Sequence, residues 1–483
     1  MRGRLRLGAG RWGLPRGWAL GAAGWILLAV QFVVAQPVFT GPEIFPLDEF
    51  AARRARVINA VGEAMVVIQG TTERPGEQPL RQNNQFFYLT GIVEPRAILV
   101  IDGRTGETRV YLQPDDERRK RQIDRMYGTG LVPGDEAAKA TGVDAVLPRD
   151  AFAAGLKEAA FAGPTIYTTF RPEVLGSASS SDPAALAKAT KDDPWDGRES
   201  REEAFVARLK TASPRSAIKD IDPILDRLRS IKSPREIAVI REATTLAGDG
   251  IVAAMRDAKP GMAEYELQAD AEYVFKKGGA YGAAYFALIA TGPNTIYSHY
   301  HKNTARLQEG ELVQFDYAPD FKYYTSDVTR VFPANGRFTA RQREMYSIYL
   351  QLYQALMTSI RVHASPGAIV KDAIVKMDAA MASFRFTDPK IRDAARRFVD
   401  GYRSRPDVSS LGHSVGMEVH DVGGAPATLE PGMIFTIEPA MTLPEEHIGV
   451  RLEDMILITE RGYENMSASV PIEIADIEKT MRR

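Results

Sequence analysis

Two apolar runs in the C-terminal half each contain a carboxylate that a buried strand does not tolerate unpaired. Residues 433–441 (MIFTIEPAM) include Glu438, and residues 448–458 (IGVRLEDMILI) include Glu453. A carboxylate inside a buried strand must be paired with a cation, protonated or bound to a metal. An ion pair between Arg451 and Glu453 is the simpler alternative. Because both runs share the same feature, the sequence favours a common site over two unrelated ion pairs.

Two aspartates lie upstream in a segment with the pattern of a hairpin. Asp316 follows the mostly apolar residues 312–315, and Asp327 precedes residues 328–332, with a turn expected near residues 318–321. Facing positions on neighbouring antiparallel strands bring side chains onto one face of a sheet. Taken alone, two aspartates near a turn are more often ordinary turn or surface carboxylates.

Histidines are scarce in this chain, which has six among 483 residues. Two of them, His413 and His420, lie in a glycine-containing segment, and their spacing fits two helical turns or a strand equally well. A single histidine there would more often be partly buried and structural. The chain has no cysteine, so metal ligands must be oxygen or nitrogen. Such a set suits two hard divalent cations and predicts metal-assisted hydrolysis; its members are Asp316, Asp327, His413, Glu438 and Glu453.

Five blocks of the C-terminal half resemble, in order, the pita-bread metallopeptidases: aminopeptidase P (Xaa-Pro aminopeptidase), prolidase and methionine aminopeptidase. A further block, RQNNQFFYLTG at residues 81–91 followed by Glu94 and Pro95, resembles the N-terminal domain of aminopeptidase P. Methionine aminopeptidases lack that domain, so the resemblance favours the proline-directed branch. The C-terminal blocks are residues 298–303 (SHYHKN), 316–327, 411–423 (LGHSVGMEVHDVG), 431–439 (PGMIFTIEP) and 449–454 (GVRLED).

The resemblance implies an α/β (α+β) protein with two domains. A smaller α/β N-terminal domain of the aminopeptidase P/creatinase type is expected at residues 45–230. A pita-bread catalytic domain is expected at residues 231–475. Dimers or tetramers are common among such relatives, so a homo-oligomer is also expected.

The resemblance also implies a role for each site residue. Asp327 and Glu453 would bridge two divalent ions, Asp316 would bind one ion, and His413 with Glu438 would complete the other. Manganese is the usual metal of the family, although cobalt, iron or zinc can occupy such sites. The remaining roles are substrate contact for His299 and His420, proton transfer for Glu438, and support of the last ligand for Arg451. Ser409 stands where many relatives carry another substrate-contacting histidine, which leaves the residue preference open.

The function implied is release of the N-terminal residue from peptides with proline in second position, by attack of a metal-bridging hydroxide. One alternative is an Xaa-Pro dipeptidase (prolidase), which shares every ligand and differs in whether the pocket blocks a longer peptide. Another is a catalytically inactive pita-bread module that serves as a binding protein. The 61 basic and 62 acidic residues give a net charge of −1, which does not indicate nucleic-acid binding.

The N-terminus has the pattern of an export signal. An apolar stretch at residues 18–35 ends in VVA before Gln36, and cleavage is expected near Ala35. An uncleaved membrane anchor is the alternative, because the stretch approaches spanning length. Either outcome places the body of the protein in the periplasm or outside the cell. The arginines that precede the stretch are Arg2, Arg4, Arg6, Arg11 and Arg16.

Local patterns predict several further elements. Ser233 and Pro234 predict the start of a helix whose core-facing residues are Ile237, Ile240, Ala243 and Ala247. A second helix is expected after Gly261. Strands are expected at residues 65–68, 86–89, 97–101 and 108–112, a surface helix at 117–126, and a solvated loop insertion at 176–201.

Overall fold

The computed structural model describes residues 40–73, 80–114, 130–159, 163–174, 176–179, 181–405 and 411–482. All of these belong to one unit, residues 37–483. The expected signal segment at residues 1–35, the expected helix at 117–126 and Ser409 lie outside the described residues. Among the helices that are described, none has the length and apolar character needed to cross a membrane.

The N-terminal half is built on a six-stranded mixed sheet with the order β4-β3-β2-β1-β5-β6. The pairs β1–β2 and β2–β3 are antiparallel, whereas β3–β4, β1–β5 and β5–β6 are parallel. The strands predicted at residues 65–68, 97–101 and 108–112 are confirmed as β1, β2 and β3. The six strands are β1 (Met65–Gln69), β2 (Ile98–Asp102), β3 (Thr108–Leu112), β4 (Ala145–Pro148), β5 (Ile166–Thr168) and β6 (Ile218–Asp220).

Both faces of this sheet are covered, as the alternation of side chains along β1 requires. Met65 and Val67 pack in a small core with Leu156 of α6 (Phe152–Ala159) and Leu209 of α8 (Arg201–Ala212). Val66 and Ile68 point to the opposite face and join the main core. That face also receives residues of α2 (Leu47–Val61) and α3 (Asn84–Thr90).

The strand predicted at residues 86–89 is wrong, because these residues form helix α3. The Asn83 side chain accepts a hydrogen bond from the Phe86 amide at 3.0 Å, and Gly91 ends the helix with φ of 65°. Every residue of α3 is buried. A short apolar run buried on all sides has no periodicity that separates helix from strand.

The predicted loop insertion at residues 176–201 is also wrong in part, because it contains helix α7 (Asp182–Asp192), which begins with Pro183 in its first turn. Alanine and lysine in this segment favour helix, and no α7 residue is buried. The other elements of the N-terminal half are α1 (Gly41–Ile44), α5 (Asp135–Thr141), a 3₁₀ turn (Arg149–Ala151) and α9 (Asp222–Ser230).

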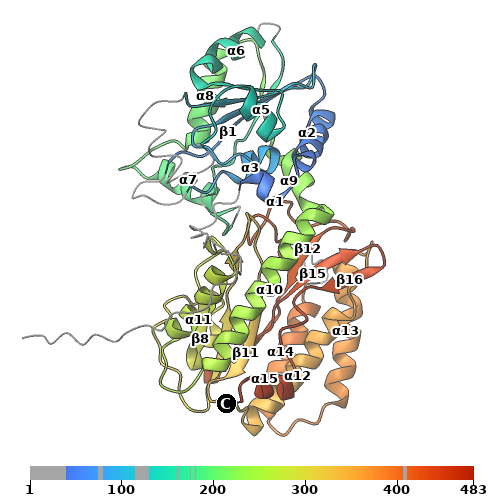
Figure 1. Ribbon diagram of the computed structural model, residues 1–483. Coiled ribbons are helices and arrows are strands. Elements are labelled where there is room, and N and C mark those ends of the chain that lie inside the picture. Colours follow the sequence, from blue (N-terminus) through green and yellow to red (C-terminus); the bar gives the residue numbers. More distant parts are fainter. Residues whose placement is uncertain are drawn as a thin grey trace, which may run out of the picture. The chain divides into compact units, whose positions relative to one another are not determined.

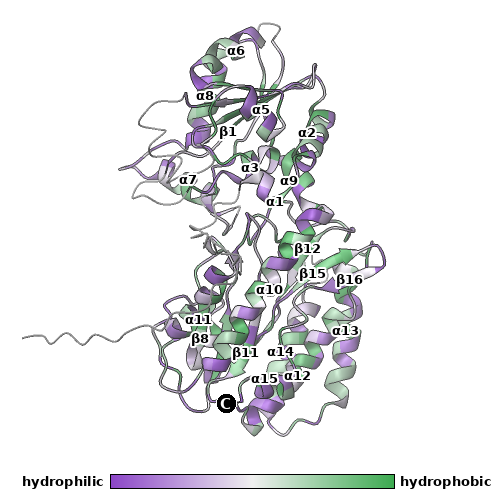
Figure 2. Cartoon of the chain, viewed as in Figure 1, coloured by the Kyte–Doolittle hydropathy of each residue, from purple (hydrophilic) through white to green (hydrophobic). Residues whose placement is uncertain are grey.

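The C-terminal half begins with two helices at the predicted places. The Ser233 side chain accepts from the Glu236 amide at 3.2 Å and caps α10 (Pro234–Asp257), confirming the predicted start. Ile240, Ala243 and Ala247 are fully buried, and α10 alternates apolar and polar residues along its length (Figure 2). Helix α11 (Glu264–Lys277) follows.

Two three-stranded sheets place the four predicted carboxylates of this half at or near the ends of their strands. One has the order β11-β9-β8 and the other β12-β15-β16, and an isolated bridge between Thr329 and Glu453 joins them. Two short two-stranded sheets, β13–β14 and β7–β10, are the remaining sheets described in this half. The bounds are β7 (Gly282–Ala283), β8 (Leu288–Thr291), β9 (Leu312–Asp316), β10 (Pro319–Asp320), β11 (Thr329–Pro333), β12 (Ile434–Ile437), β13 (Ala440–Leu443), β14 (Ile448–Arg451), β15 (Asp454–Thr459) and β16 (Gly462–Asn465).

Further helices pack beside these strands. Helices α12 (Ala340–Met357), α13 (Pro366–Ser383) and α14 (Pro389–Arg403) pack against one another (Figure 1), and α14 contacts β13. The described part of the C-terminal half also contains two 3₁₀ turns and a last helix; these are Gly292–Ile296, Pro444–Glu446 and α15 (Ile474–Thr480).

Candidate active site

The five predicted metal ligands converge in the C-terminal half. Oxygen atoms of Asp316, Asp327 and Glu453 lie within 4.8 Å of one another, and so do ligand atoms of His413, Glu438 and Glu453. A third overlapping group contains Asp327, His413 and His420. Glu453 is common to the first two groups, so the five side chains form one continuous cluster.

The carboxylates lie where strands begin or end. Asp316 is the last residue of β9 and pairs in register with Thr329, the first residue of β11. Asp327 lies just before β11, which agrees with the predicted hairpin. The tight turn itself lies further along than predicted, where Lys322 and Tyr323 have φ of 51° and 69°.

Glu438 and Glu453 do not interrupt continuous strands, which corrects the sequence interpretation. Glu438 follows the last residue of β12, and Glu453 lies between β14 and β15. The two also differ in exposure: the side chain of Glu453 is 1% exposed and that of Glu438 is 29% exposed. Breaks between strands let both carboxylates reach the same site.

Arg451 pairs with Asp316, and not with Glu453 as the simpler sequence alternative supposed. Its guanidinium also donates to the Ser298 carbonyl oxygen at 3.2 Å. Because both side chains of the pair are about 5% exposed, this ion pair fixes the position of Asp316 beside the other carboxylates.

Three hydroxyl groups that the sequence analysis missed hold the carboxylates. The Tyr285 hydroxyl lies 2.6 Å from Asp316 Oδ1 and 2.7 Å from Asp327 Oδ1. Thr329 donates to Glu453 Oε2 at 2.6 Å. Thr436 donates to Glu438 Oε1 at 3.2 Å. Thr329 lies two residues from Asp327, and Thr436 lies two residues from Glu438. Side chains two residues apart in a strand share one face. This spacing could therefore have indicated that both threonines face the site. Tyr285 offered no such signal.

The electrostatics of the cluster show an excess of negative charge. Burial and neighbouring carboxylates raise the pKa of Glu453 well above its ordinary value. Burial also raises the pKa of Asp316 to about 7, although Arg451 opposes the shift. Burial disfavours a charged His413, yet its Nε2 lies 3.4 Å from Asp327 and 3.2 Å from Glu438, and their hydrogen bonds raise its pKa well above 6.5.

Divalent cations fit this donor set. Buried Glu453 Oε1 has no hydrogen-bond partner among the described atoms, although His413 Nε2 is 3.8 Å away. An unsatisfied buried carboxylate oxygen is costly unless a cation binds it. Four carboxylates and an imidazole are ligands that manganese-like cations accept.

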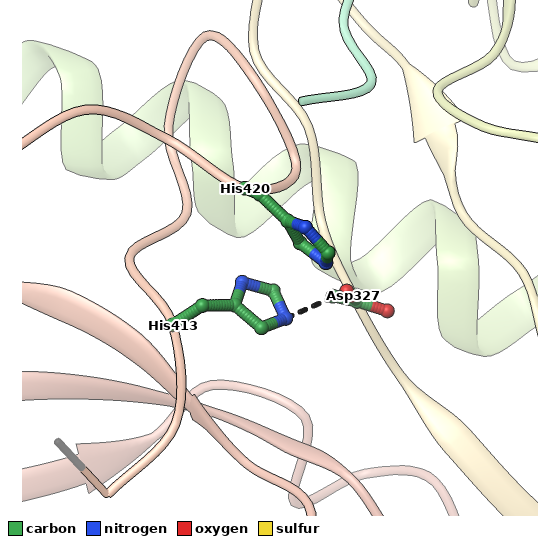
Figure 3. A group of neighbouring side chains, drawn as sticks. All are labelled: Asp327, His413 and His420. Carbon is green, nitrogen blue, oxygen red and sulfur yellow. Dashed lines mark ion pairs between the residues drawn. The ribbon is translucent and has the colours of Figure 1, made fainter. Parts of the chain in front are cut away.

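His413 and His420 come from an irregular segment, residues 411–426, so neither the helical nor the strand spacing applies. Their ring centroids are 4.1 Å apart, and Figure 3 shows His413 pointing at Asp327 with His420 beside it. The His299 ring lies 6.4 Å from that of His420. Burial and the nearby His413 lower the pKa of His420, which favours a neutral imidazole.

A buried ion network anchors this segment from behind. Arg229 of α9 donates to Glu418 Oε2 at 2.8 Å and to Asp421 Oδ1 at 2.6 Å, and Lys232 lies 3.2 Å from Asp421 Oδ2. Asn84 donates to Glu418 Oε1 at 2.5 Å. The block at residues 81–91 therefore holds the polypeptide that carries His420.

The site opens into a cavity of about 170 Å³, whose lining includes the five predicted ligands with Tyr285, His299, His420 and Arg451. Ala178, Ser179 and Asp182 of the N-terminal half also line it. The structure therefore brings every predicted site residue to one cavity.

Comparisons with known proteins agree with this arrangement. The pattern of metallopeptidase family M24 matches residues 238–460, and that of the aminopeptidase P N-terminal domain matches residues 50–167. A Xaa-Pro aminopeptidase of Escherichia coli is 30% identical over 455 residues, covering 90% of this chain and 97% of the relative. A Xaa-Pro dipeptidase of Pyrococcus furiosus is 31% identical over 268 residues, covering 55% of this chain and 70% of the relative. The solved structure of zinc-substituted Escherichia coli aminopeptidase P with product has a TM-score of 0.71, 28% identity, and coverage of 91% of this chain and 99% of that one.

The matched patterns and the carboxylate-rich cavity define a peptidase with a pita-bread catalytic domain, and they confirm the expected α/β (α+β) fold. Within that class, the chain belongs to the aminopeptidase P family. The inactive binding module expected as an alternative is not favoured by this assignment.

Proposed function

We propose that this protein releases the N-terminal residue from peptides whose second residue is proline, using two divalent cations. One observation carries the proposal: two groups of ligand atoms share Glu453 in a single cavity. The residues that would hold the cations are Asp316, Asp327, His413, Glu438 and Glu453. Manganese is the proposed native metal, with cobalt, iron and zinc as alternatives.

Bound divalent cations would supply a polarised water near neutral pH and positive charge for the developing oxyanion. Glu438 is the most exposed of the four carboxylates and has one oxygen bound by Thr436. We assign it the transfer of a proton from the attacking water to the departing nitrogen, because a general base must lie within hydrogen-bond reach of the reacting groups.

The imidazoles of His299 and His420 would contact the substrate. A neutral His420 can donate one hydrogen bond to the carbonyl oxygen of the cleaved bond as negative charge develops there. The His299 ring lies 6.4 Å from that of His420, and we assign His299 a contact with the substrate. Arg451 and Tyr285 are positioning residues, because they hold Asp316 and Asp327.

Proline in second position makes the cleaved bond a tertiary amide with no N–H group. Recognition must therefore use the ring and the free amino group. The relative named as a Xaa-Pro aminopeptidase covers 90% of this chain, and the Xaa-Pro dipeptidase covers 55%. This difference favours the aminopeptidase over the dipeptidase.

Kinetics on paired substrates test the specificity. We expect hydrolysis of a tetrapeptide Xaa-Pro-Yaa-Zaa as well as of the dipeptide Xaa-Pro. Hydrolysis confined to the dipeptide would show a prolidase. Peptides with alanine in place of proline are the control, and faster cleavage of those peptides would contradict proline selectivity.

Metal analysis tests the site. Protein stripped with a chelator and reloaded with manganese should bind about two ions per chain. Asp327→Ala should lose metal and all activity, whereas Asp378→Ala, at an exposed position on α13, should keep both. Fewer than one ion per wild-type chain would reject the proposal and favour the binding module.

We further propose that the protein is exported, with residues 1–35 as the signal, and that it forms dimers or tetramers. The arginine-rich start and the apolar stretch support export. N-terminal sequencing of protein from cell fractions should find Gln36 first in the periplasm or medium. Full-length protein in the membrane fraction would show an anchor, and full-length protein in the cytoplasm would contradict export.

Light scattering tests the proposed oligomer. A solution that contains only monomers would contradict the proposed dimer or tetramer.

A further inference from the structure

A second and larger cavity borders the active-site cavity. Its volume is about 730 Å³, and it shares Ala178, Ser179 and Asp182 with the cavity that contains the candidate metal ligands. The active-site cavity, at about 170 Å³, is smaller than the range of about 300–1,000 Å³ typical of ligand sites. A substrate longer than a few residues must therefore extend beyond it.

Ala178 and Ser179, which line both cavities, are attached to the irregular segment that carries His420. The Val419 amide donates to the Ser177 carbonyl oxygen at 2.7 Å, and the His420 amide donates to that of Ala178 at 3.0 Å. Ser179 forms a parallel bridge with His420. Ser177 and Ser179 are buried. This part of the predicted insertion is thus fixed against a residue assigned to substrate contact.

Helix α7 comes next among the described elements and lines part of the larger cavity. It contributes Pro183, Leu186 and Ala187, while Pro172 and Val174 also line the cavity. Leu186 is 69% exposed. A single exposed leucine needs no explanation, but an apolar strip that lines a cavity is typical of a binding surface.

We propose that this larger cavity, which we call the tail cavity, binds the fourth and later residues of extended peptide substrates. The inference rests on the proposed function and names its substrate class as peptides with a tail of several residues. Shared lining residues make the two cavities neighbours, and the apolar strip suits apolar side chains of a peptide. The tail cavity would then contribute binding energy that a dipeptide cannot use.

Filling the tail cavity tests this. Ala187 lines it, whereas Ala189 of the same helix is exposed and does not line it. The two variants Ala187→Trp and Ala189→Trp therefore place the same side chain inside and outside the cavity. Both are assayed on the tripeptide Ala-Pro-Ala and on an apolar octapeptide that begins with the same three residues.

We expect Ala187→Trp to lower kcat/KM for the octapeptide by about tenfold, equivalent to about 1.4 kcal/mol, mainly through KM. The tripeptide should be cleaved at the wild-type rate, which also shows that the variant folds. Ala189→Trp should change neither. Leu186→Asp, at a position exposed enough to tolerate a charge, should weaken octapeptide cleavage in the same selective way.

If Ala187→Trp and Leu186→Asp cleaved the octapeptide at the wild-type rate, the inference would be overturned. An equal loss on tripeptide and octapeptide would overturn it too, because that would place the effect in the catalytic site. Failure of the wild type to cleave either peptide would instead contradict the proposed function, so the two failures are distinguishable.

Discussion

Single residues in the cluster differ mainly in what neutralises them. Asp316 has Arg451 as an ion-pair partner and a hydrogen bond with Tyr285. Asp327 has His413, whose hydrogen bond holds the pKa of this carboxyl below its usual range despite burial. Glu453 has only Thr329 on one oxygen and no hydrogen-bond partner among described atoms on the other. The need for an added cation is therefore greatest at Glu453, which the two ligand groups share.

His420→Ala should lower kcat by about 100-fold, the scale expected when one donor to a developing oxyanion is removed. The metal content should stay near that of the wild type, because His420 is assigned to substrate and not to metal. Metal analysis beside steady-state kinetics checks both parts. Loss of metal in this variant would show that His420 is a ligand, as its place in the third ligand group allows.

Asp270 of α11 offers a test of pH dependence away from the site. Burial, together with Asp257 and Glu266, raises its pKa to about 6, and its Oδ2 is buried without a hydrogen-bond partner among described atoms. The unfolded chain loses this proton near pH 4. The charged carboxylate thus destabilises the folded protein increasingly as pH rises from about 4 to 6, and fully above 6.

Asp270→Asn should therefore raise Tm at pH 8 and leave it nearly unchanged at pH 4.5. Thermal unfolding at both pH values measures the difference. Asp249→Asn, at an exposed position on α10, is the matched control and should change Tm at neither pH. A lower Tm for Asp270→Asn at pH 8 would contradict the account.

At the scale of elements, the site depends on an irregular segment that buried ion pairs between side chains hold in place. Residues 411–426 have no helix or strand to fix His413 and His420. Arg229 of α9 compensates two buried carboxylates, Glu418 and Asp421, and its own side chain is 2% exposed. Breaking such a pair leaves uncompensated buried charge, which costs more than the pair itself contributes.

Arg229→Met should lower the free energy of unfolding by about 3–5 kcal/mol and lower activity, because the segment with His420 loses its anchor. Arg227→Met on the same helix is exposed and should have neither effect. Thermal unfolding and peptide hydrolysis measured on the same samples test both expectations. Wild-type stability in Arg229→Met would show that the network contributes little.

At the scale of the whole described unit, the N-terminal half supports the catalytic half through buried polar contacts. Arg81 binds Asp320 at 2.6 Å, and the Phe87 ring stacks on Tyr323 with centroids 3.6 Å apart. The candidate ligands come from several separate strands and a loop, so the site exists only in the folded chain. Metal binding is therefore coupled to folding.

Manganese should accordingly raise Tm in proportion to the logarithm of its concentration once the site is filled. At 100 times Kd the added stability is about 2.7 kcal/mol per site. Calorimetry of chelator-treated protein across a manganese series measures this. Asp327→Ala should show almost no rise, and an equal rise in that variant would place the stabilising ion elsewhere.

The sequence by itself determined the features that local chemistry encodes. Ser233 followed by Pro234 specifies a helix start because the capping group and its target are three residues apart. Strands β1, β2 and β3 follow from short apolar runs bounded by turn residues. Glu438 and Glu453 stood out because charged residues within apolar runs need a partner. Asp316, Asp327 and His413 became candidates only through the joint pattern, and the role of all five as ligands stays a prediction.

Tertiary structure alone decided which groups meet. Arg451 pairs with Asp316 across two sheets, Tyr285 reaches two aspartates, and buried residues 86–89 became helix α3. In the predicted insertion, local pattern did not reveal that residues 177–179 pair with the His420 segment. Contacts between distant residues depend on how whole sheets pack and are not written in the spacing of neighbouring residues, which is why these partners had to be found in the fold.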